Sequence, residues 1–456
     1  MNGDLTSGHP LKKILIFCIP MLIGNLFQQL YTVINSIIVG KFLGVEAFAA
    51  VGSTSSLHAL VIGFAVGLCS GLSIPVAQHY GAGNVPALRK AESAAIYIAG
   101  IASVLISLTM LFFTDPILRL LGTPDNLHEN AAAYIRTLCA GSGALILYNL
   151  VINFMRALGD SRTPLVFLIL SAVLNVALDL FFVVLLGLGV TGAATATVLA
   201  QLLSALLGLR SIRKGFPVLF LDKETLRPSL KEMRRLSAAA LPVGLQSSIT
   251  AIGSIVMQMA INRLGAQAVA AAAVGSKVAN ILMAPLDAVG IGIVIFTCQN
   301  YGAGHLRRIS KGVLQAMLAL AAYSLVSLGI LWVAGLSFAR LFISSEEAEF
   351  LALVQTYLRT SGCFFCSVSV IYVYRNALQG LGWSNAAMGS GLCEMISRIL
   401  VALLLLPSLG FVGVSLSSPL AWTCAALFLV PMYYFAMKQT GKKLHPPMAD
   451  ASKACA

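Results

Sequence analysis

A chain of 456 residues in which 58% of side chains are apolar and only 10% are charged cannot cover a water-facing surface. Soluble domains carry about 25% charged residues, so lipid is the expected solvent for most of this sequence. The formal net charge of +13 is typical of basic cytoplasmic loops, and we expect no nucleic-acid partner. The nine cysteines are scattered, and we expect no cofactor and no resident metal.

Twelve apolar runs are long enough to cross a bilayer, which requires roughly 20 helical residues. The first follows a short polar tail and Lys12–Lys13, without a small-residue cleavage site, so we expect a span and not a leader. The runs predict an all-α integral membrane protein. The expected spans are 14–39, 53–77, 93–113, 133–155, 164–186, 190–209, 238–262, 275–298, 312–335, 353–374, 386–407 and 412–436.

Lysine and arginine support this topology. With the amino terminus inside, 22 of the 30 basic residues fall in inner segments, among them Arg375, six fall outside and two, Lys277 and Arg398, fall within spans. Such a bias sets membrane orientation. It predicts a multi-pass protein of the plasma (inner) membrane with both termini cytoplasmic.

The two halves of the chain repeat. Gln78-His-Tyr-Gly-Ala-Gly83 recurs as Gln299-Asn-Tyr-Gly-Ala-Gly304. Because each half has six spans, the halves have the same orientation, as parallel repeats related by an axis along the membrane normal. Further matches, at the same or nearly the same offset, pair Pro20 with Pro242, Phe42-Leu-Gly44 with Arg263-Leu-Gly265, Gly189-Val-Thr-Gly192 with Gly410-Phe-Val-Gly413, and Leu158-Gly-Asp-Ser161 with Leu381-Gly-Trp-Ser384.

The repeat predicts two pseudo-symmetric six-helix lobes around a central cleft, a layout suited to alternating access. The basic segment between the halves predicts an inter-lobe linker. The expected domains are an N-terminal lobe (1–209), a cytoplasmic linker (210–237), a C-terminal lobe (238–437) and a cytoplasmic tail (438–456).

Several motifs resemble those of the multidrug and toxic compound extrusion (MATE) family, within the multidrug/oligosaccharidyl-lipid/polysaccharide flippase superfamily. The resemblance covers residues 10–437 and implies a V-shaped pair of six-helix lobes. It also implies export of organic cations or amphipathic molecules, driven by sodium ions or protons. The motifs that carry it are Pro20, Gln28, Ile37-Ile-Val-Gly-Lys-Phe-Leu-Gly44, Gln78-x-Tyr-Gly-Ala-Gly-Asn84, Arg156-Ala-Leu-Gly-Asp160 and Leu174-Asn175…Leu178-Asp179.

An ionisable group at bilayer depth costs roughly 2.5–3.5 kcal/mol on insertion scales, so its presence there requires a reason. Asp179 is therefore a candidate cation-coupling residue. Asn175 lies one turn before it on the same face. At ~1.5 Å per residue, Asp179, Thr197 and Asn35 fall in one layer roughly 8–12 Å below the outer ends of their spans. Such oxygen groups suit a proton or a sodium ion, although Asn175 and Thr197 also fit plain interhelical hydrogen bonds. In the resemblance these residues match cation-site positions, and Asn35 replaces an acidic residue that many members carry.

In the family that the sequence resembles, a sodium-coupled branch carries acidic residues on the seventh and tenth spans. Here the positions near Thr250 and Ser367–Ser369 are uncharged. The charged residues within the spans of the second half differ from those of the first. Asp287 lies ten residues from Lys277, roughly 15 Å along a helix, and is a candidate anchor for a cationic substrate. Glu394 and Arg398 share a helix face at i,i+4 and can form a structural ion pair. The resemblance implies that they line the C-terminal lobe or hold helices together, and we take both as candidate substrate contacts.

Three positions on the first span complete the candidates. Pro20 either bends the helix, since an internal proline removes a hydrogen bond, or starts it. Gln28 and Tyr31 are candidate substrate contacts, although an aromatic at helical spacing is also typical of packing.

We expect a secondary active multidrug exporter and not an enzyme. Its expected partners are small-molecule substrates and membrane lipid, and we expect it to be a monomer. The alternative is a flippase or exporter of lipid-linked sugar or polysaccharide.

Overall fold

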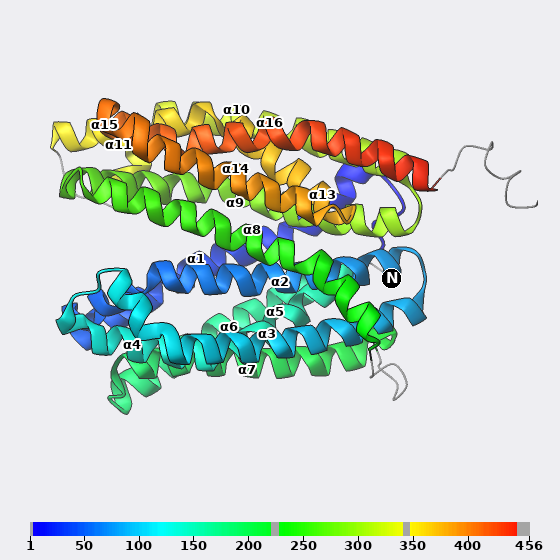
Figure 1. The fold of residues 1–456 in the computed structure, drawn as a ribbon, viewed down its shortest axis with the longest axis horizontal. Helices are drawn as coiled ribbons and strands as arrows, with labels where there is room; N and C mark the ends of the chain where they lie inside the picture. The colour runs from blue at the N-terminus through cyan, green and yellow to red at the C-terminus, as the bar shows by residue number, and fades with distance from the viewer. Residues whose placement is uncertain (1–2, 220–227, 341–346, 445–456) are drawn as a thin grey trace, which may run out of the picture. The chain divides into compact units, whose positions relative to one another are not determined.

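The protein is all helical. The computed structural model describes residues 3–219, 228–340 and 347–444, and every regular element in these ranges is a helix (Figure 1). Parts of the predicted linker (220–227) and tail (445–456) lie outside the described residues. The all-α prediction is confirmed.

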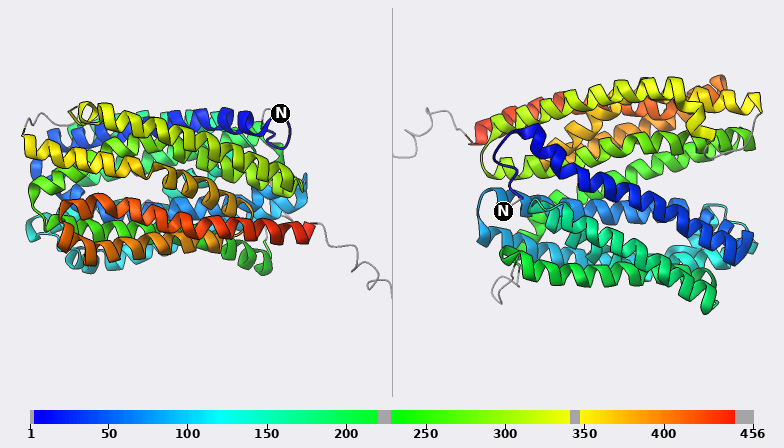
Figure 2. Two further views of the ribbon diagram at one scale, coloured as in Figure 1. Left: turned by 90° about the horizontal axis from the view of Figure 1, so that it is seen from above. Right: turned by 180° about the vertical axis from the view of Figure 1, so that it is seen from behind.

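Contacts divide the chain into two compact units. Unit 1 comprises Met1–Asp4, Ile19–Tyr80 and Asn84–Ala251, and unit 2 comprises Leu5–Cys18, Gly81–Gly83 and Ile252–Ala456. The predicted domain limits at 209 and 238 follow the sequence repeat and stay a prediction. Figure 2 shows from two further sides how the helices of each unit run alongside one another.

The first half of the chain forms seven α-helices and a π-helical turn. The turn η1 continues α6, and a short 3-10 turn, η2 (Pro217–Leu219), follows α7. The elements are α1 (Pro10–Ser53), α2 (Ser55–Gly81), α3 (Val85–Leu120), α4 (Asp125–Ala140), α5 (Ser142–Ala157), α6 (Arg162–Asp179), η1 (Leu180–Leu185) and α7 (Gly189–Gly215).

The second half follows the same order with more breaks. Its elements are α8 (Leu230–Asn262), α9 (Ala266–Gly302), α10 (Leu306–Arg340), α11 (Ala348–Cys363), α12 (Phe365–Val370), η3 (Ile371–Arg375), α13 (Asn376–Gly380), α14 (Ser384–Leu400), η4 (Val401–Leu405), α15 (Leu406–Leu409) and α16 (Phe411–Leu444). Helices α7 and α8 therefore extend into the segment predicted as a linker.

All twelve predicted spans fall on helices. Ten helices in the described ranges are long and apolar enough to cross a membrane, and α4 with α5 makes an eleventh, bent by 48°. The remaining predicted span, 353–374, is divided among α11, α12 and η3. The two predicted spans that are not continuous are thus the fourth of each half.

These two breaks occupy equivalent places in the repeat. Helix α4 ends at Ala140 and α11 at Cys363, the same offset as that between the matched turns at Leu158 and Leu381. The next residues, Gly141 (φ −83°, ψ 10°) and Phe364 (φ −107°, ψ 10°), both leave the helical region. The two halves thus share the position at which their fourth predicted span is interrupted.

Gly141 also has a packing role at its break. A Cβ atom added to this glycine would lie 2.2 Å from Val198 Cγ2 on α7. The absent side chain therefore allows the bend between α4 and α5 to pack closely on α7.

Glycine explains one of the repeated motifs. Gly44 (φ 85°) and Gly265 (φ 92°) both adopt a positive φ angle, which side chains other than glycine rarely allow. Both stand directly after the first predicted span of their half, where the chain turns sharply. The matched Leu-Gly dipeptides are therefore a backbone requirement.

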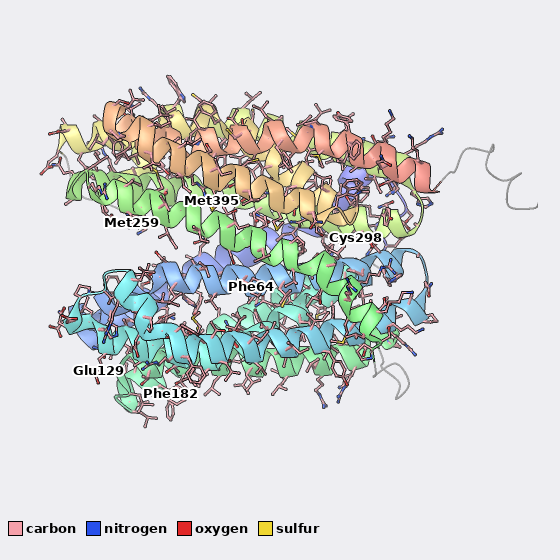
Figure 3. The ribbon with its side chains drawn as sticks, in the orientation of Figure 1. Phe64, Glu129, Phe182, Met259, Cys298 and Met395 are labelled. Atoms are coloured by element: carbon pink, nitrogen blue, oxygen red, sulfur yellow. The ribbon has the colours of Figure 1, made fainter. Side chains whose placement is uncertain are left out.

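The outer surfaces of the helices are apolar. Val333 is 90% exposed and Leu120 is 87% exposed, and Figure 3 shows side chains projecting outward along the helices. Lipid-facing helices satisfy their backbone groups internally and present such surfaces. The exposed apolar residues support a membrane-spanning protein.

Pro20 lies inside α1, which begins ten residues earlier at Pro10. The helix-start interpretation of Pro20 is therefore wrong, and the alternative, an internal proline, is the observed position.

A buried apolar cluster in unit 1 joins α1, α4, η1 and α7. Its members include Ile38, Tyr134, Val183 and Val190, with Val176 and Val198 packed against them. Because the cluster holds these helices together next to Asn175 and Asp179, it fixes the spacing of the polar residues described next.

Candidate functional site

Asp179 is the last residue of α6, where the chain passes into the π-helical turn η1. Its side chain is fully buried. Single π-helical turns are rare and often occur at functional sites. The repeat preserves this feature, because η1 starts at Leu180 and η4 at Val401, the offset that also separates Gln78 from Gln299.

Asn175 connects Asp179 to α7. The amide orientation that satisfies its neighbours places the nitrogen 2.7 Å from Asp179 Oδ2 and the oxygen 3.0 Å from both the backbone nitrogen and the hydroxyl of Thr197. Asn175 therefore donates to the carboxylate and accepts from α7. The expected convergence of these three residues is observed.

Tyr31 extends the network to α1. Its hydroxyl lies 3.3 Å from the Asn175 amide and accepts a hydrogen bond of 3.2 Å from Asn35 Nδ2. Asn35 thus joins the layer through Tyr31. The sequence placed Tyr31 among substrate contacts, and the structure adds this position within the polar layer.

The two oxygens of Asp179 differ. Oδ2 accepts from Asn175, whereas Oδ1 is buried and has no hydrogen-bond donor among the described residues. A buried acceptor without a donor is costly. A proton on the carboxyl group, or a sodium ion beside it, would remove this cost, so the arrangement suits either cation.

Two cavities in unit 1 meet at this layer. The larger, about 500 Å³, has mixed polar and apolar walls, within the range of ligand pockets. The smaller, about 60 Å³, lies against Asn175. Asn35 lines the larger cavity, so the predicted substrate contacts and cation-coupling residues are neighbours. Four residues line both cavities: Gln28, Tyr31, Thr197 and Gln201.

Gln201 was missed in the sequence analysis. It follows Thr197 by four residues on α7, and both residues line the two cavities. The i,i+4 spacing from an already selected residue was the available signal.

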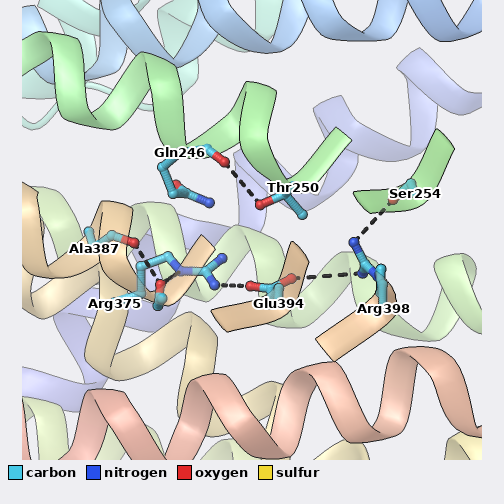
Figure 4. A network of polar contacts seen from close by, with 8 residues as sticks. Gln246, Thr250, Ser254, Arg375, Ala387, Glu394 and Arg398 are labelled. Atoms are coloured by element: carbon cyan, nitrogen blue, oxygen red, sulfur yellow. Dashed lines mark hydrogen bonds and ion pairs between the residues drawn. The ribbon is translucent and has the colours of Figure 1, made fainter. Parts of the chain in front are cut away.

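A second group of buried charges lies in unit 2 (Figure 4). Arg375 Nη2 forms a close ion pair with Glu394 Oε1, and Arg375 Nε donates 2.8 Å to Ser390 Oγ. Arg398 Nη2 lies 3.8 Å from Glu394 Oε2, and its Nη1 donates 3.1 Å to Ser254 Oγ on α8. We call Arg375, Glu394 and Arg398 the arginine cluster.

This cluster corrects one assignment. The sequence placed Arg375 in an inner loop, but it ends the π-helical turn η3, and its side chain is only 13% exposed. An arginine that closes an apolar run is easily taken for a loop residue. The predicted Glu394–Arg398 contact exists, but Arg375 is the nearer partner.

Asp287 lies apart from the Asp179 layer, on α9 in unit 2. It stands three residues before Gly290, and a Cβ atom added to that glycine would lie 2.6 Å from Asn376 Nδ2 and 3.1 Å from the Tyr372 ring. The absent side chain allows α9 to approach η3 closely. Asp287 and Gly290, three residues apart, lie on the same side of α9.

The family follows from comparison with known proteins. The MatE family model matches residues 20–181 and 242–404. The chain belongs to the MatE family. The two matched blocks cover the two halves of the repeat, and the resemblance found in the sequence is confirmed.

Relatives of this MatE transporter span nearly the same length. The chain is 29% identical over 440 residues to the probable multidrug resistance protein YoeA of Bacillus subtilis, covering 94% of each chain. It is 23% identical to the FAD transporter of Shewanella oneidensis, covering 86% of this chain and 87% of that one. A crystal structure of MATE in complex with MaL6 superposes with a TM-score of 0.88 at 23% identity, covering 97% of this chain and 99% of that one. The structural match shows that the fold is that of MATE transporters.

Proposed function

We propose that this protein is a secondary active exporter of organic cations or amphipathic small molecules, exchanged for sodium ions or protons by alternating access. We place it in the plasma (inner) membrane, with both termini in the cytoplasm, and acting as a monomer. The names of relatives such as the probable multidrug resistance protein YoeA support the export of small molecules.

Asp179 Oδ1, the buried carboxylate oxygen described above, is the observation that carries the coupling proposal. Asn175, Thr197 and Asn35 surround the cation site, directly or through Tyr31. A cation that neutralises Asp179 changes the hydrogen bonds that Asn175 makes with this carboxylate and with Thr197.

Tyr31 and Thr197 transmit that change to the larger cavity, because both line it. The cavity, with Gln28 and Tyr31 on its wall, is where an amphipathic molecule binds in unit 1. Cation and substrate then compete through shared hydrogen-bond partners, which is the thermodynamic requirement for exchange. Asp287 is a separate proposed anchor, within unit 2, for the cationic group of a substrate.

Proteoliposomes containing the full chain test this proposal. A sodium gradient and a proton gradient are imposed in separate experiments, and uptake of ethidium is followed. We expect one of the two gradients to drive accumulation and Asp179→Asn to lower it by roughly 5–150-fold, the range of typical coupling free energies. Equal uptake with and without both gradients would reject secondary active transport, and full gradient-driven uptake by Asp179→Asn would reject the assignment of this residue.

A further inference from the structure

The larger cavity of unit 1 has a wall without formal charge. Helices α1, α2, α4, α5 and α7 all contribute to it, with polar side chains placed among apolar ones. Among the described residues that line it there is no aspartate, glutamate, lysine or arginine. Asp179 is not among the residues that line either cavity. A charged group that enters the larger cavity therefore meets no counter-charge on its wall, and an unpaired charge away from water is costly.

His58 on α2 places an imidazole ring at this wall. The ring packs edge to face against Tyr134 of α4, with the ring centroids 6.4 Å apart. Within the described ranges the imidazole makes no hydrogen bond and no ion pair. Because a charge in such a place needs a partner, the imidazole is neutral, so one nitrogen donates and the other accepts. His58 thus offers both kinds of hydrogen bond to a molecule in the cavity.

Two glutamines offer further hydrogen bonds. Gln28 on α1 and Gln201 on α7 line both cavities, and their side-chain amides make no hydrogen bond within the described parts of the chain. The hydroxyl groups of Thr32 and Ser36, in contrast, donate to carbonyl groups one turn earlier on α1, at 2.9 Å each. The two amides therefore stay available to a bound molecule, and each of them both donates and accepts.

Aromatic rings complete the wall. Tyr31 and Phe48 of α1 and Tyr134 of α4 all line the cavity, and Phe48 is 47% exposed. Aromatic side chains favour stacked or edge-on contacts with other flat rings. The volume of about 500 Å³ lies within the range of pockets that bind drug-sized ligands. The wall as a whole fits a flat, uncharged ring system with hydrogen-bond donors and acceptors on its edge.

We propose that this cavity binds the uncharged heteroaromatic part of the transported molecule, and that His58 and Gln201 determine which ring systems it accepts. This inference rests on the proposed function and names the substrate class of unit 1, which is neutral amphipathic heterocycles with a ring N–H and a carbonyl group. A permanently cationic ring binds the cavity more weakly than its neutral counterpart, because the wall supplies hydrogen bonds and no counter-charge.

Three acridine derivatives form a matched set of probes. Acridone is flat and uncharged and has a ring N–H and a carbonyl group, N-methylacridone lacks the N–H, and the N-methylacridinium ion has a permanent positive charge and no carbonyl group. Dissociation constants are measured by equilibrium dialysis against full-length protein in detergent, with protein-free micelles as the blank. We expect the wild-type protein to bind acridone roughly two- to tenfold more tightly than N-methylacridone, and roughly tenfold or more tightly than the acridinium ion.

Two variants remove the proposed contacts. His58→Phe keeps a ring against Tyr134 and removes both nitrogens, and Gln201→Leu keeps a similar volume and removes the amide. Each should weaken acridone binding by roughly two- to tenfold, the loss of one neutral hydrogen bond, and change acridinium binding less. His79→Phe is the matched control, because His79 lies on the same helix and outside the cavity wall; it should leave all three dissociation constants unchanged.

A third variant reverses the preference. Gln201→Glu places a carboxylate on the wall, so it should shift the ratio of the two affinities towards the acridinium ion by roughly fivefold or more, since opposite charges attract. An unchanged ratio in this variant would overturn the inference, as would wild-type protein that binds the acridinium ion as tightly as acridone. Equal loss of all three probes in His58→Phe and Gln201→Leu would identify both residues as structural and would also overturn it.

The proposed function is tested separately by gradient-driven uptake of ethidium in proteoliposomes. If ethidium is transported and acridone is not preferred in the binding measurement, only the present inference fails. If neither gradient drives ethidium uptake while the preference for acridone and its loss in His58→Phe are observed, the proposed function fails and the binding preference of the cavity stands.

Discussion

The two halves of this MatE transporter bury different charged side chains next to matching π-helical turns, Asp179 before η1 and Glu394 with Arg398 before η4. In unit 1, Asn175 donates to the buried carboxylate of Asp179 and Tyr31 closes the layer. In unit 2, Arg375 and Arg398 pair with the buried carboxylate of Glu394, and Gly253 of α8 lies beside Arg398. The π-helical turns η1 and η4 occupy matching places in the repeat, so the backbone is shared between the halves while the chemistry is not. One duplicated fold thus surrounds a buried carboxylate in one half and a cluster of ion-paired arginines in the other.

The largest effect is expected from removing the carboxylate of the arginine cluster, which tests whether this cluster stabilises unit 2. Glu394→Gln leaves Arg375 and Arg398 without their counter-charge, and breaking a buried ion pair typically costs about 3–5 kcal/mol. We expect the free energy of unfolding to fall by about that amount, measured as the loss of monodisperse protein on heating in detergent. An unchanged transition would show that the cluster does not hold α14 against η3.

A double-mutant cycle measures how the interaction of Glu394 is divided between the two arginines. Glu394→Gln combined with Arg375→Gln should show a larger coupling free energy than Glu394→Gln combined with Arg398→Gln, because only Arg375 contacts the carboxylate at hydrogen-bond distance. Neighbouring residues in one network typically couple by about 0.5–3 kcal/mol. A larger coupling to Arg398 would contradict the assignment of Arg375 as the nearer partner of Glu394.

A smaller effect is expected from filling the space beside Arg398. Gly253→Ala places a methyl group against Met395 and Arg398, and overpacking typically costs about 1–3 kcal/mol. Gly329→Ala on α10 is the control, since a Cβ atom there meets nothing within 4 Å and alanine favours a helix over glycine by about 0.5–1 kcal/mol. Thermal unfolding in detergent should therefore separate the two variants, and equal stabilities would argue against the close approach of α8 and α14.

The smallest expected effect concerns the link between α1 and α6. Tyr31→Phe removes the hydroxyl between Asn35 and Asn175, a loss of about 0.5–1.5 kcal/mol for a neutral hydrogen bond. The half-saturating concentration of the driving ion should change by roughly two- to tenfold, measured in proteoliposomes. Tyr97→Phe, on an exposed part of α3, should leave it unchanged, and equal shifts in both variants would remove Tyr31 from the coupling layer.

Much of the fold could be predicted from the sequence. The low charge content required lipid, the apolar runs marked all twelve helical segments, and the Gln-x-Tyr-Gly-Ala-Gly repeat revealed the duplication. The breaks at Gly141 and Phe364 could not be predicted, because the apolar runs continue through them. They depend on packing, such as that of Gly141 against Val198 on α7.

The site was predictable to a similar extent. Asp179, Asn175 and Thr197 were found because a carboxylate at bilayer depth needs partners on neighbouring helices at the same depth. Arg375 was missed because sequence alone does not show that a π-helical turn continues past the apolar run and buries its last residue. The position of Tyr31 beside Asn175 depends on the distance between α1 and α6, which no sequence spacing gives.

Two buried carboxylates of unit 1 provide the most direct test of the central claim, that cation coupling belongs to Asp179. Glu92 on α3 is 5% exposed and Asp179 is fully buried, so Glu92→Gln is a matched control for Asp179→Asn. The measurement is the flux of sodium ions or protons that follows addition of rhodamine B ethyl ester to proteoliposomes. We predict that the flux per dye molecule moved is lost in Asp179→Asn and retained in Glu92→Gln; retention in Asp179→Asn, or loss in Glu92→Gln alone, would contradict the account.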